Sequence, residues 1–377
     1  MKKLCVSLMA FVALLCVSCS NDPEIPEIKD NGIDVTLSIT TNPLTKALET
    51  DQDKNPAPID PTKDLLVYFM NASSSTVASY KLTDAQITAI QSGSGFKFTN
   101  LDESVVSVYV VANVPSGTLP ATAPGTTLDA INGKVQNISD QQTDNAASVV
   151  LANTGKTVKT SFTSVAAATN GNLQFTAAVE LTPIVSRIQI KKVSVDETIT
   201  SFKLEGIYID NFYPQMTIGG AFSGIDIVTA DDKADFDATK EPYKTTNLYD
   251  ESTSGLVQNP FGATTPQVYG YQIFPTTSTA HENVPYIILK ISNIVTSSAA
   301  TRNIPSGTYY VAVKAYKNTG ASTSVTTFSP GFIYTIDDIP VSENNIVTDP
   351  TNSLINVTVN VTVKAWGSIV LDPDFGY

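Results

Sequence analysis

The chain has 377 residues, of which 42% are hydrophobic and 16% charged, and its formal net charge is -13. This length predicts about two domains, each with its own apolar core. Its longest basic runs are the pairs Lys2-Lys3 and Lys191-Lys192. An acidic chain without a basic patch repels phosphate backbones, so we do not expect nucleic acid as a partner.

The amino terminus has the pattern of an export signal. Lys2-Lys3 precedes the apolar stretch 4–17, which is shorter than the ~20 residues of a membrane-spanning helix and is typical of a secretory signal peptide. The stretch ends at Ser18-Cys19, a small residue before a cysteine, as in a bacterial lipobox. We therefore predict a lipoprotein signal peptide over 1–19 with acylation, including palmitate, at Cys19. The alternative is a plain signal peptide without a lipid.

Cysteine is confined to this leader. The three cysteines are Cys5, Cys16 and Cys19, so residues 20–377 cannot form a disulfide, a thiolate nucleophile or a cysteine-ligated metal site. Residues 20–31 combine proline spacing with acidic charge and lack an apolar period, which predicts a tether.

The remaining chain reads as β-strands. Its apolar residues recur mainly at every second position and are separated by glycine- and asparagine-containing turn signals, which predicts an all-β fold. Two short segments look helical: a capping box at Thr83 to Gln86, and a stripe formed by Leu128, Ile131 and Val135. We expect two β-sandwich domains in series with short crossover helices, over residues 47–180 and 181–377.

Catalytic and phosphate-binding patterns are weak. A Ser-His-Asp triad would need His281, the only histidine, which stands in a loop-like stretch. Gly155-Lys156-Thr157 resembles the end of a phosphate loop, but Val150 stands where that loop requires glycine. Paired carboxylates for glycoside cleavage and exposed tyrosines for glycan binding stay open, since such groups meet only in space. We expect no enzymatic activity and no cofactor.

An acidic cluster offers oxygen ligands for calcium. Its members are Asp231, Asp232, Asp235 and Asp237. The cluster lacks the turn glycine and the distal glutamate of a calcium loop, so a solvated loop is the favoured interpretation and calcium the alternative.

Two alternating segments lie near the ends of the chain. Residues 33–40 place Ile33, Val35, Leu37 and Ile39 on one face, and residues 355–365 do the same with Ile355, Val357, Val359, Val361, Val363 and Ala365. Each is either an ordinary strand of its own domain or a strand that inserts into a groove of another. After the first segment, a polar connection with Pro43 presents Lys46 before Ala47, which predicts a trypsin-like cleavage site.

The chain resembles the fimbrillin family, the subunits of type V pili, over nearly its whole length. The segments that carry the resemblance are Leu66-Val67-Tyr68-Phe69, Tyr109-Val110-Val111-Ala112-Asn113, Val179-Glu180-Leu181-Thr182-Pro183-Ile184-Val185-Ser186-Arg187-Ile188, Gly307-Thr308-Tyr309-Tyr310-Val311-Ala312-Val313 and Val361-Thr362-Val363-Lys364-Ala365-Trp366. The resemblance implies two transthyretin-like, Greek-key β-sandwiches made as a lipoprotein.

It further implies polymerisation by donor-strand exchange. A protease would cut after Lys46 and remove 20–46, the tether and first strand, and the tail 354–377 of a neighbouring subunit, including Trp366, would fill the groove. The expected protein is a structural fimbrial subunit on the cell outer membrane that supports cell adhesion. Its expected partners are copies of itself, other pilus subunits and a host or bacterial surface ligand. The alternatives are an anchor or tip adhesin of the same pilus, or a monomeric surface lipoprotein that binds a glycan or protein.

Overall fold

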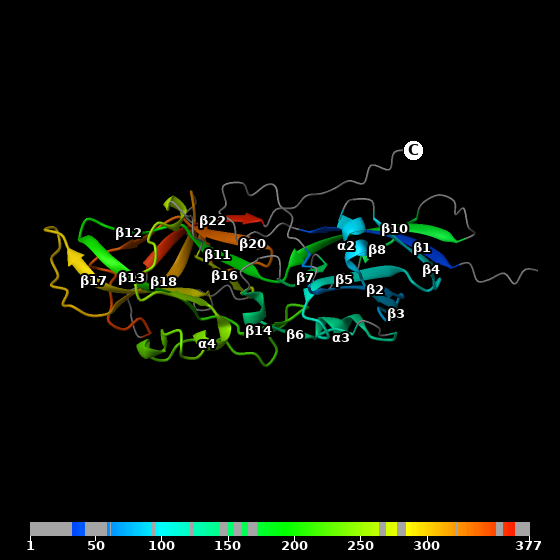
Figure 1. Ribbon diagram of the computed structural model, residues 1–377, viewed down its shortest axis with the longest axis horizontal. Helices are drawn as coiled ribbons and strands as arrows, with labels where there is room; N and C mark the ends of the chain where they lie inside the picture. The colour runs from blue at the N-terminus through cyan, green and yellow to red at the C-terminus, as the bar shows by residue number, and fades with distance from the viewer. Residues whose placement is uncertain are drawn as a thin grey trace, which may run out of the picture.

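The protein is elongated and consists of two β-domains placed end to end (Figure 1). The computed structural model describes residues 32–41, 59–60, 62–91, 95–120, 124–142, 149–153, 160–164, 172–263, 269–276, 284–320, 323–351 and 357–365. The all-β, two-domain fold expected from the alternating pattern is confirmed.

The first domain is built on one sheet in the order β3-β2-β5-β7-β10-β1-β4, with β8 beside β5 and β9 beside β10. Its strands are β1 (Ile33–Thr41), β2 (Asp64–Met70), β3 (Thr76–Lys81), β4 (Phe96–Leu101), β5 (Ser107–Val114), β7 (Leu151–Asn153), β8 (Thr160–Ser161), β9 (Thr163–Ser164) and β10 (Leu173–Pro183). Every residue of β2 and β5 is buried, so both faces of the sheet are covered there.

Two short helices accompany this sheet. Helix α2 (Asp84–Gln91) begins after Thr83, as expected, and the Gln86 half of the predicted capping box is present: the Thr83 N–H donates to Gln86 Oε1 at 2.8 Å. Helix α3 (Leu128–Asn132) contains Leu128 and Ile131. The prediction that Val135 continues their helical stripe is wrong, because the Gly133 N–H closes the helix on Asp129 O and Val135 then opens strand β6.

The second domain has a sheet in the order β15-β13-β17-β18-β22-β20-β11-β16, with β19 beside β18. Its strands are β11 (Ser186–Ile190), β13 (Ile199–Asp210), β15 (Tyr249–Glu251), β16 (Tyr269–Ile273), β17 (Tyr286–Thr296), β18 (Tyr309–Asn318), β19 (Ser324–Val325), β20 (Phe332–Ile336) and β22 (Val357–Ala365). A separate parallel pair joins β12 (Val193–Val195) to β21 (Ile339–Val341). The expected limit at residue 180 falls inside β10, which keeps the chain in the first sheet to Pro183.

Backbone pairing ties the domains together. Strand β6 (Val135–Asn137) pairs antiparallel with β14 (Gln215–Thr217), whose Met216 is fully buried. The side-chain amide of Gln142 also binds both the N–H and the carbonyl of Gln272, in the edge strand β16. The domain junction is therefore held by hydrogen bonds in addition to apolar contact.

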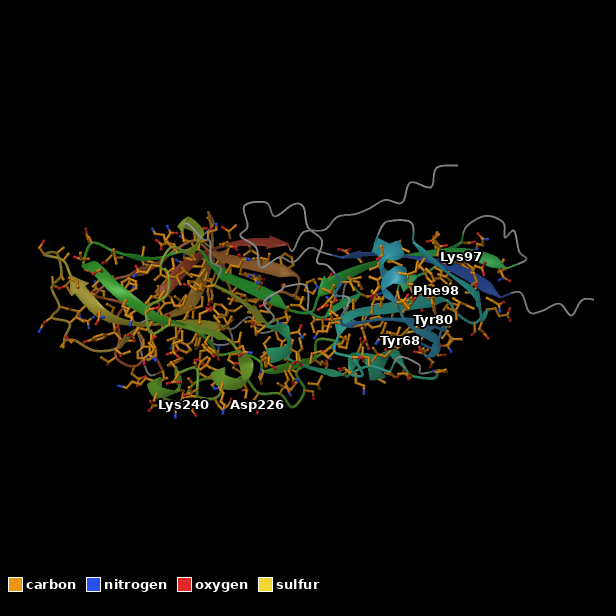
Figure 2. The ribbon with its side chains drawn as sticks, in the orientation of Figure 1. Tyr68, Tyr80, Lys97, Phe98, Asp226 and Lys240 are labelled. Carbon is orange, nitrogen blue, oxygen red and sulfur yellow. The ribbon has the colours of Figure 1, made fainter. Side chains whose placement is uncertain are left out.

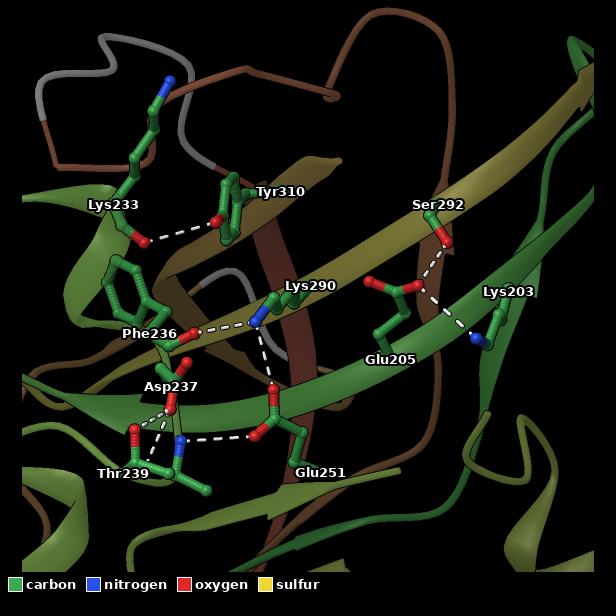
Figure 3. A network of polar contacts seen from close by, with 11 residues as sticks. Lys203, Glu205, Lys233, Phe236, Asp237, Thr239, Glu251, Lys290, Ser292 and Tyr310 are labelled. Atoms are coloured by element: carbon green, nitrogen blue, oxygen red, sulfur yellow. Dashed lines mark hydrogen bonds and ion pairs between the residues drawn. The ribbon is translucent and has the colours of Figure 1, made fainter. Parts of the chain in front are cut away.

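Residues 230–246, which include helix α4 (Tyr243–Thr246), pack through Ala230, Phe236 and Tyr243 on the face of the second sheet that carries Tyr208 and Tyr310. Tyr208 stacks edge-on against Tyr243 with ring centroids 5.0 Å apart. At the rim, Lys290 Nζ donates to Phe236 O and to Glu251 Oε1, both at 3.0 Å (Figure 3). Because both faces of the sheet are covered here, residues 206–210 of β13 and 309–313 of β18 are all buried.

Under this segment lies a buried acid, Asp210, which is 3% exposed. Its Oδ1 accepts the Ala230 N–H at 2.8 Å. Burial raises the pKa of the Asp210 carboxyl to about 6, although hydrogen bonds from the Ala230 and Asn211 backbone and the charge of Lys314 oppose the rise. Because the folded pKa lies above the unfolded value, this group contributes stability that is complete below about pH 4 and is lost as the pH rises through 6.

We predict that Asp210→Asn removes this dependence. The free energy of unfolding of the wild type, relative to that of the variant, should fall by on the order of 3 kcal/mol between pH 4 and pH 7. Denaturant titrations at a series of pH values measure it, and the exposed Asp226→Asn serves as the control. A difference that does not vary with pH would contradict the prediction.

Candidate functional site: the leader strand and its slot

Strand β1, called here the leader strand, occupies an interior position of the first sheet. It pairs in parallel with β10, from Ile33 opposite Leu173 to Thr41 opposite Leu181, and antiparallel with β4. Strands β10 and β4 are not neighbours of each other, so the leader strand joins them (Figure 1). We call the position between β10 and β4 the leader slot.

The four apolar side chains predicted for one face of the leader strand are all buried. Ile33, Val35, Leu37 and Ile39 are 2%, 0%, 0% and 4% exposed. The alternation therefore identifies the face that packs into the core.

Aromatic rings line the slot around Val35. This residue lies opposite Phe175 of β10 and Phe98 of β4. Phe98 packs edge-on against Phe69 and tilted against Tyr80, with ring centroids 4.9 Å apart in both pairs, and Figure 2 shows Phe98 and Tyr80 in the same part of the domain. The leader strand thus lies between two strands that each place a phenylalanine opposite Val35, and one of these rings, Phe98, belongs to an aromatic cluster.

The leader strand also buries a charge that the sequence pattern did not identify. Asp34 is 1% exposed, and its Oδ2 lies 3.0 Å from Lys97 Nζ. Its Oδ1 accepts the Asn100 N–H at 3.0 Å and an Asn172 Nδ2 hydrogen at 2.8 Å. Alternation assigns Asp34 to the polar face, and the partners that bury it come from distant parts of the chain, so no local signal could have found them.

Strand β4 depends on the leader strand. It is the terminal strand of the described sheet and pairs there only with β1. Helix α2, which precedes it, contacts both β1 and β4. Removal of β1 would therefore deprive β4 of its sheet partner and expose one edge of β10.

The alternating tail segment forms β22 inside the sheet of its own domain. It pairs in parallel with β18 and antiparallel with β20. Val357, Val359 and Val361 are 8%, 3% and 0% exposed, and Val363 is partly buried. Ala365 ends the strand opposite Phe332. In the single chain, β22 therefore has the same arrangement of neighbours as β1: one parallel and one antiparallel partner.

Several predicted site residues lie outside the described residues: Cys19, Lys46, Ala47, Ile355 and Trp366. His281 and Gly155-Lys156-Thr157 lie outside them as well. No helix in the described part of the chain is long and apolar enough to cross a membrane.

The acidic cluster is organised by local hydrogen bonds. Asp232 Oδ1 accepts the Ala234 N–H, and Asp235 Oδ2 accepts the Asp232 N–H, which together form a capping box. Asp237 accepts hydrogen bonds from Thr239, which hold the pKa of that carboxyl below its usual value. Within the described ranges, no group of acidic, histidine or cysteine side chains is arranged to hold a metal ion.

Solved structures share this architecture. A fimbrilin from Porphyromonas gingivalis W83 superposes with a TM-score of 0.55 at 13% identity, over 90% of this chain and 99% of that one. A candidate cell adhesion protein from Bacteroides eggerthii gives 0.53 at 14% identity, over 89% and 95% of the two chains. One from Parabacteroides distasonis gives 0.52 at 14% identity, over 89% and 99%. No family model and no curated protein matches the sequence. The chain thus has the two-domain fold of a fimbrilin and of candidate cell adhesion proteins.

We predict that the leader strand supplies a large part of the stability of the first domain. Leu37→Ala should lower the free energy of unfolding by about 2–5 kcal/mol, because it removes a fully buried side chain and leaves a cavity. Chemical denaturation measures the loss. The matched control is Leu173→Ala, since Leu173 is 60% exposed and its truncation should cost within about 0.5 kcal/mol. Equal effects of the two substitutions would show that the slot does not bear on stability.

Proposed function

We propose that this chain is a fimbrillin-type structural subunit of a surface fimbrium, exported as a lipoprotein and polymerised by donor-strand exchange. The observation that carries the proposal is the position of the leader strand, which is joined to the body through the connection that contains Lys46. The leader strand precedes the other described strands of the first domain in chain order, so one cut in the connection that follows it separates it from them without cutting the rest of the domain.

The energetics favour exchange only after cleavage. Four buried apolar side chains stabilise the seated leader by roughly 6 to 12 kcal/mol as an upper limit, in addition to its backbone hydrogen bonds. While the leader remains covalently attached, it returns to the slot each time it leaves. Cleavage after Lys46 would convert it into a separate peptide that can diffuse away, and a tail from another copy could then complete the sheet.

The place of β22 between β18 and β20 bears on which part of the tail could be donated. Donation of residues 355–365 requires β22 to leave its place between β18 and β20 and to divide the second sheet. Residues 366–377, which follow β22, are the other part of the predicted donor tail and could be donated while β22 stays. Deletion of the whole tail 354–377 would remove β22 as well, so it would disturb folding together with any donation.

The alternative with a specific observation in its favour is a monomeric surface lipoprotein. In the single chain both positions are filled by its own strands, the leader slot by β1 and the place between β18 and β20 by β22. Such a chain is complete without a neighbour, which suits either an unprocessed subunit or a monomer. An anchor subunit that keeps its leader strand fits the same observation.

We predict that filament formation requires cleavage after Lys46. Amino-terminal sequencing of filaments sheared from cells should give a start at Ala47. Lys46→Ala should abolish filaments and leave the full-length chain at the cell surface. The matched control is Lys54→Ala in the same connection, which should polymerise normally. Filaments that retain residues 20–46 would contradict donor-strand exchange and favour the other roles.

A disulfide across β20 and β22 tests which part of the tail is donated. Thr335 and Thr362 face each other in the antiparallel pair, and residues 20–377 contain no cysteine. If residues 355–365 are donated, Thr335→Cys/Thr362→Cys should polymerise only under reducing conditions, while Thr362→Cys alone polymerises in both. Polymerisation of the oxidised protein would assign donation to residues 366–377.

A further inference from the structure

We propose that Asp34 is a polar lock that holds the leader strand in one register in its slot and makes the leader a stronger occupant than β22. The first part concerns the single chain. The second part rests on the proposed donor-strand exchange.

The lock connects both sides of the slot. Lys97 and Asn100 belong to β4, whereas Asn172 immediately precedes β10. One carboxylate, on a residue 1% exposed, contacts all three through the ion pair and the two hydrogen bonds described above. Charge-assisted hydrogen bonds of this kind are shorter and stronger than neutral ones. The leader therefore clamps β4 to β10 through a side chain as well as through its backbone.

The position of the lock is explained by an irregularity in β4. Between Ile33 and Val35 the pairing moves from Leu101 to Phe98, so β4 carries one residue more than β1 over this stretch. Asn100 adopts a left-handed backbone conformation with φ of 58°. Its N–H bonds to the Asp34 carboxylate. The bulge thus creates a donor that needs a side-chain acceptor from the neighbouring strand.

This requirement fixes the register of the leader strand. A slip by two residues keeps the apolar face inward but brings Gly32 or Thr36 to the place of Asp34. Neither residue carries a carboxylate for Lys97. The register also places a glycine at position 32, where a Cβ would lie only 2.8 Å from Asn100 Oδ1 and would clash with it.

Strand β22 cannot reproduce the lock. Residues 357–365 contain valine, threonine, asparagine, lysine and alanine but no aspartate or glutamate. In the slot, such a strand could offer the Asn100 N–H an amide or hydroxyl oxygen, but Lys97 would have to turn to water, which its 42% exposed side chain allows. The ion pair between Asp34 and Lys97 therefore distinguishes the leader from β22. Because the ion pair must break before the leader leaves, it slows the release of the leader and so the replacement of the leader by another strand.

The test measures leader release without any filament. A recognition site for a sequence-specific protease is placed within residues 48–54 of the full chain, the chain is cut there, and the leader that stays bound is followed by gel filtration and mass spectrometry. Asp34→Asn preserves shape and removes the charge, and it should release the leader at least tenfold faster than the wild type, because a hydrogen bond to a charged group is lost. Asp102→Asn, an exposed aspartate on the same domain, should release it at the wild-type rate.

Lys97→Met tests the same ion pair from the other side and keeps the proposal falsifiable if Asp34→Asn fails to fold. Lys97→Met should also accelerate release of the leader. The double variant Asp34→Asn/Lys97→Met should release it no faster than the faster single variant, because each single change already breaks the Asp34–Lys97 ion pair. Wild-type release rates in folded Asp34→Asn or in folded Lys97→Met would overturn the lock. Since no polymer is scored, absence of filaments in cells would count against the proposed function and leave the lock standing.

Discussion

The first domain depends on a strand that pairs on both sides and precedes the other described strands of its sheet in chain order. The leader strand provides the sheet contact of β4 and one edge partner of β10. Because β1 precedes the other described strands of its sheet in chain order, one backbone cleavage in the connection after it would separate it from them, and its loss would leave two unpaired edges. Such edges readily accept a strand from another molecule.

Strands β1 and β22 have the same kind of position in their two sheets. The leader strand lies between β10 and β4, and β22 lies between β18 and β20, each with one parallel and one antiparallel neighbour. The first position loses its occupant if the chain is cut, whereas the second keeps it. A chain without its leader would therefore lack one strand in the first sheet, and its second sheet would stay complete unless β22 itself moved.

Polar contacts give this arrangement its specificity. Apolar alternation is shared by the leader and β22, so burial of valine, leucine and isoleucine does not by itself distinguish one from the other. A carboxylate that bridges β4 and the start of β10 does distinguish them, because an ion pair and a bulge N–H impose both a charge and a register. Hydrophobic burial supplies most of the stability, and the buried charge decides which strand fits.

The sequence by itself determined the all-β fold, the start of α2 and the inward faces of β1 and β22, because alternation and capping are properties of a few neighbouring residues. The apolar stripe by itself did not show that Val135 leaves the helix of Ile131, where the helix is capped at Gly133 and Val135 pairs with β14 instead. Only the tertiary structure decided that Asp34 is buried, that β4 pairs with the leader strand alone in the described sheet, and that β22 lies within the sheet of the second domain. Each of these facts depends on which distant strands become neighbours, and a strand's side-chain pattern specifies a face to bury without specifying the partner that buries it.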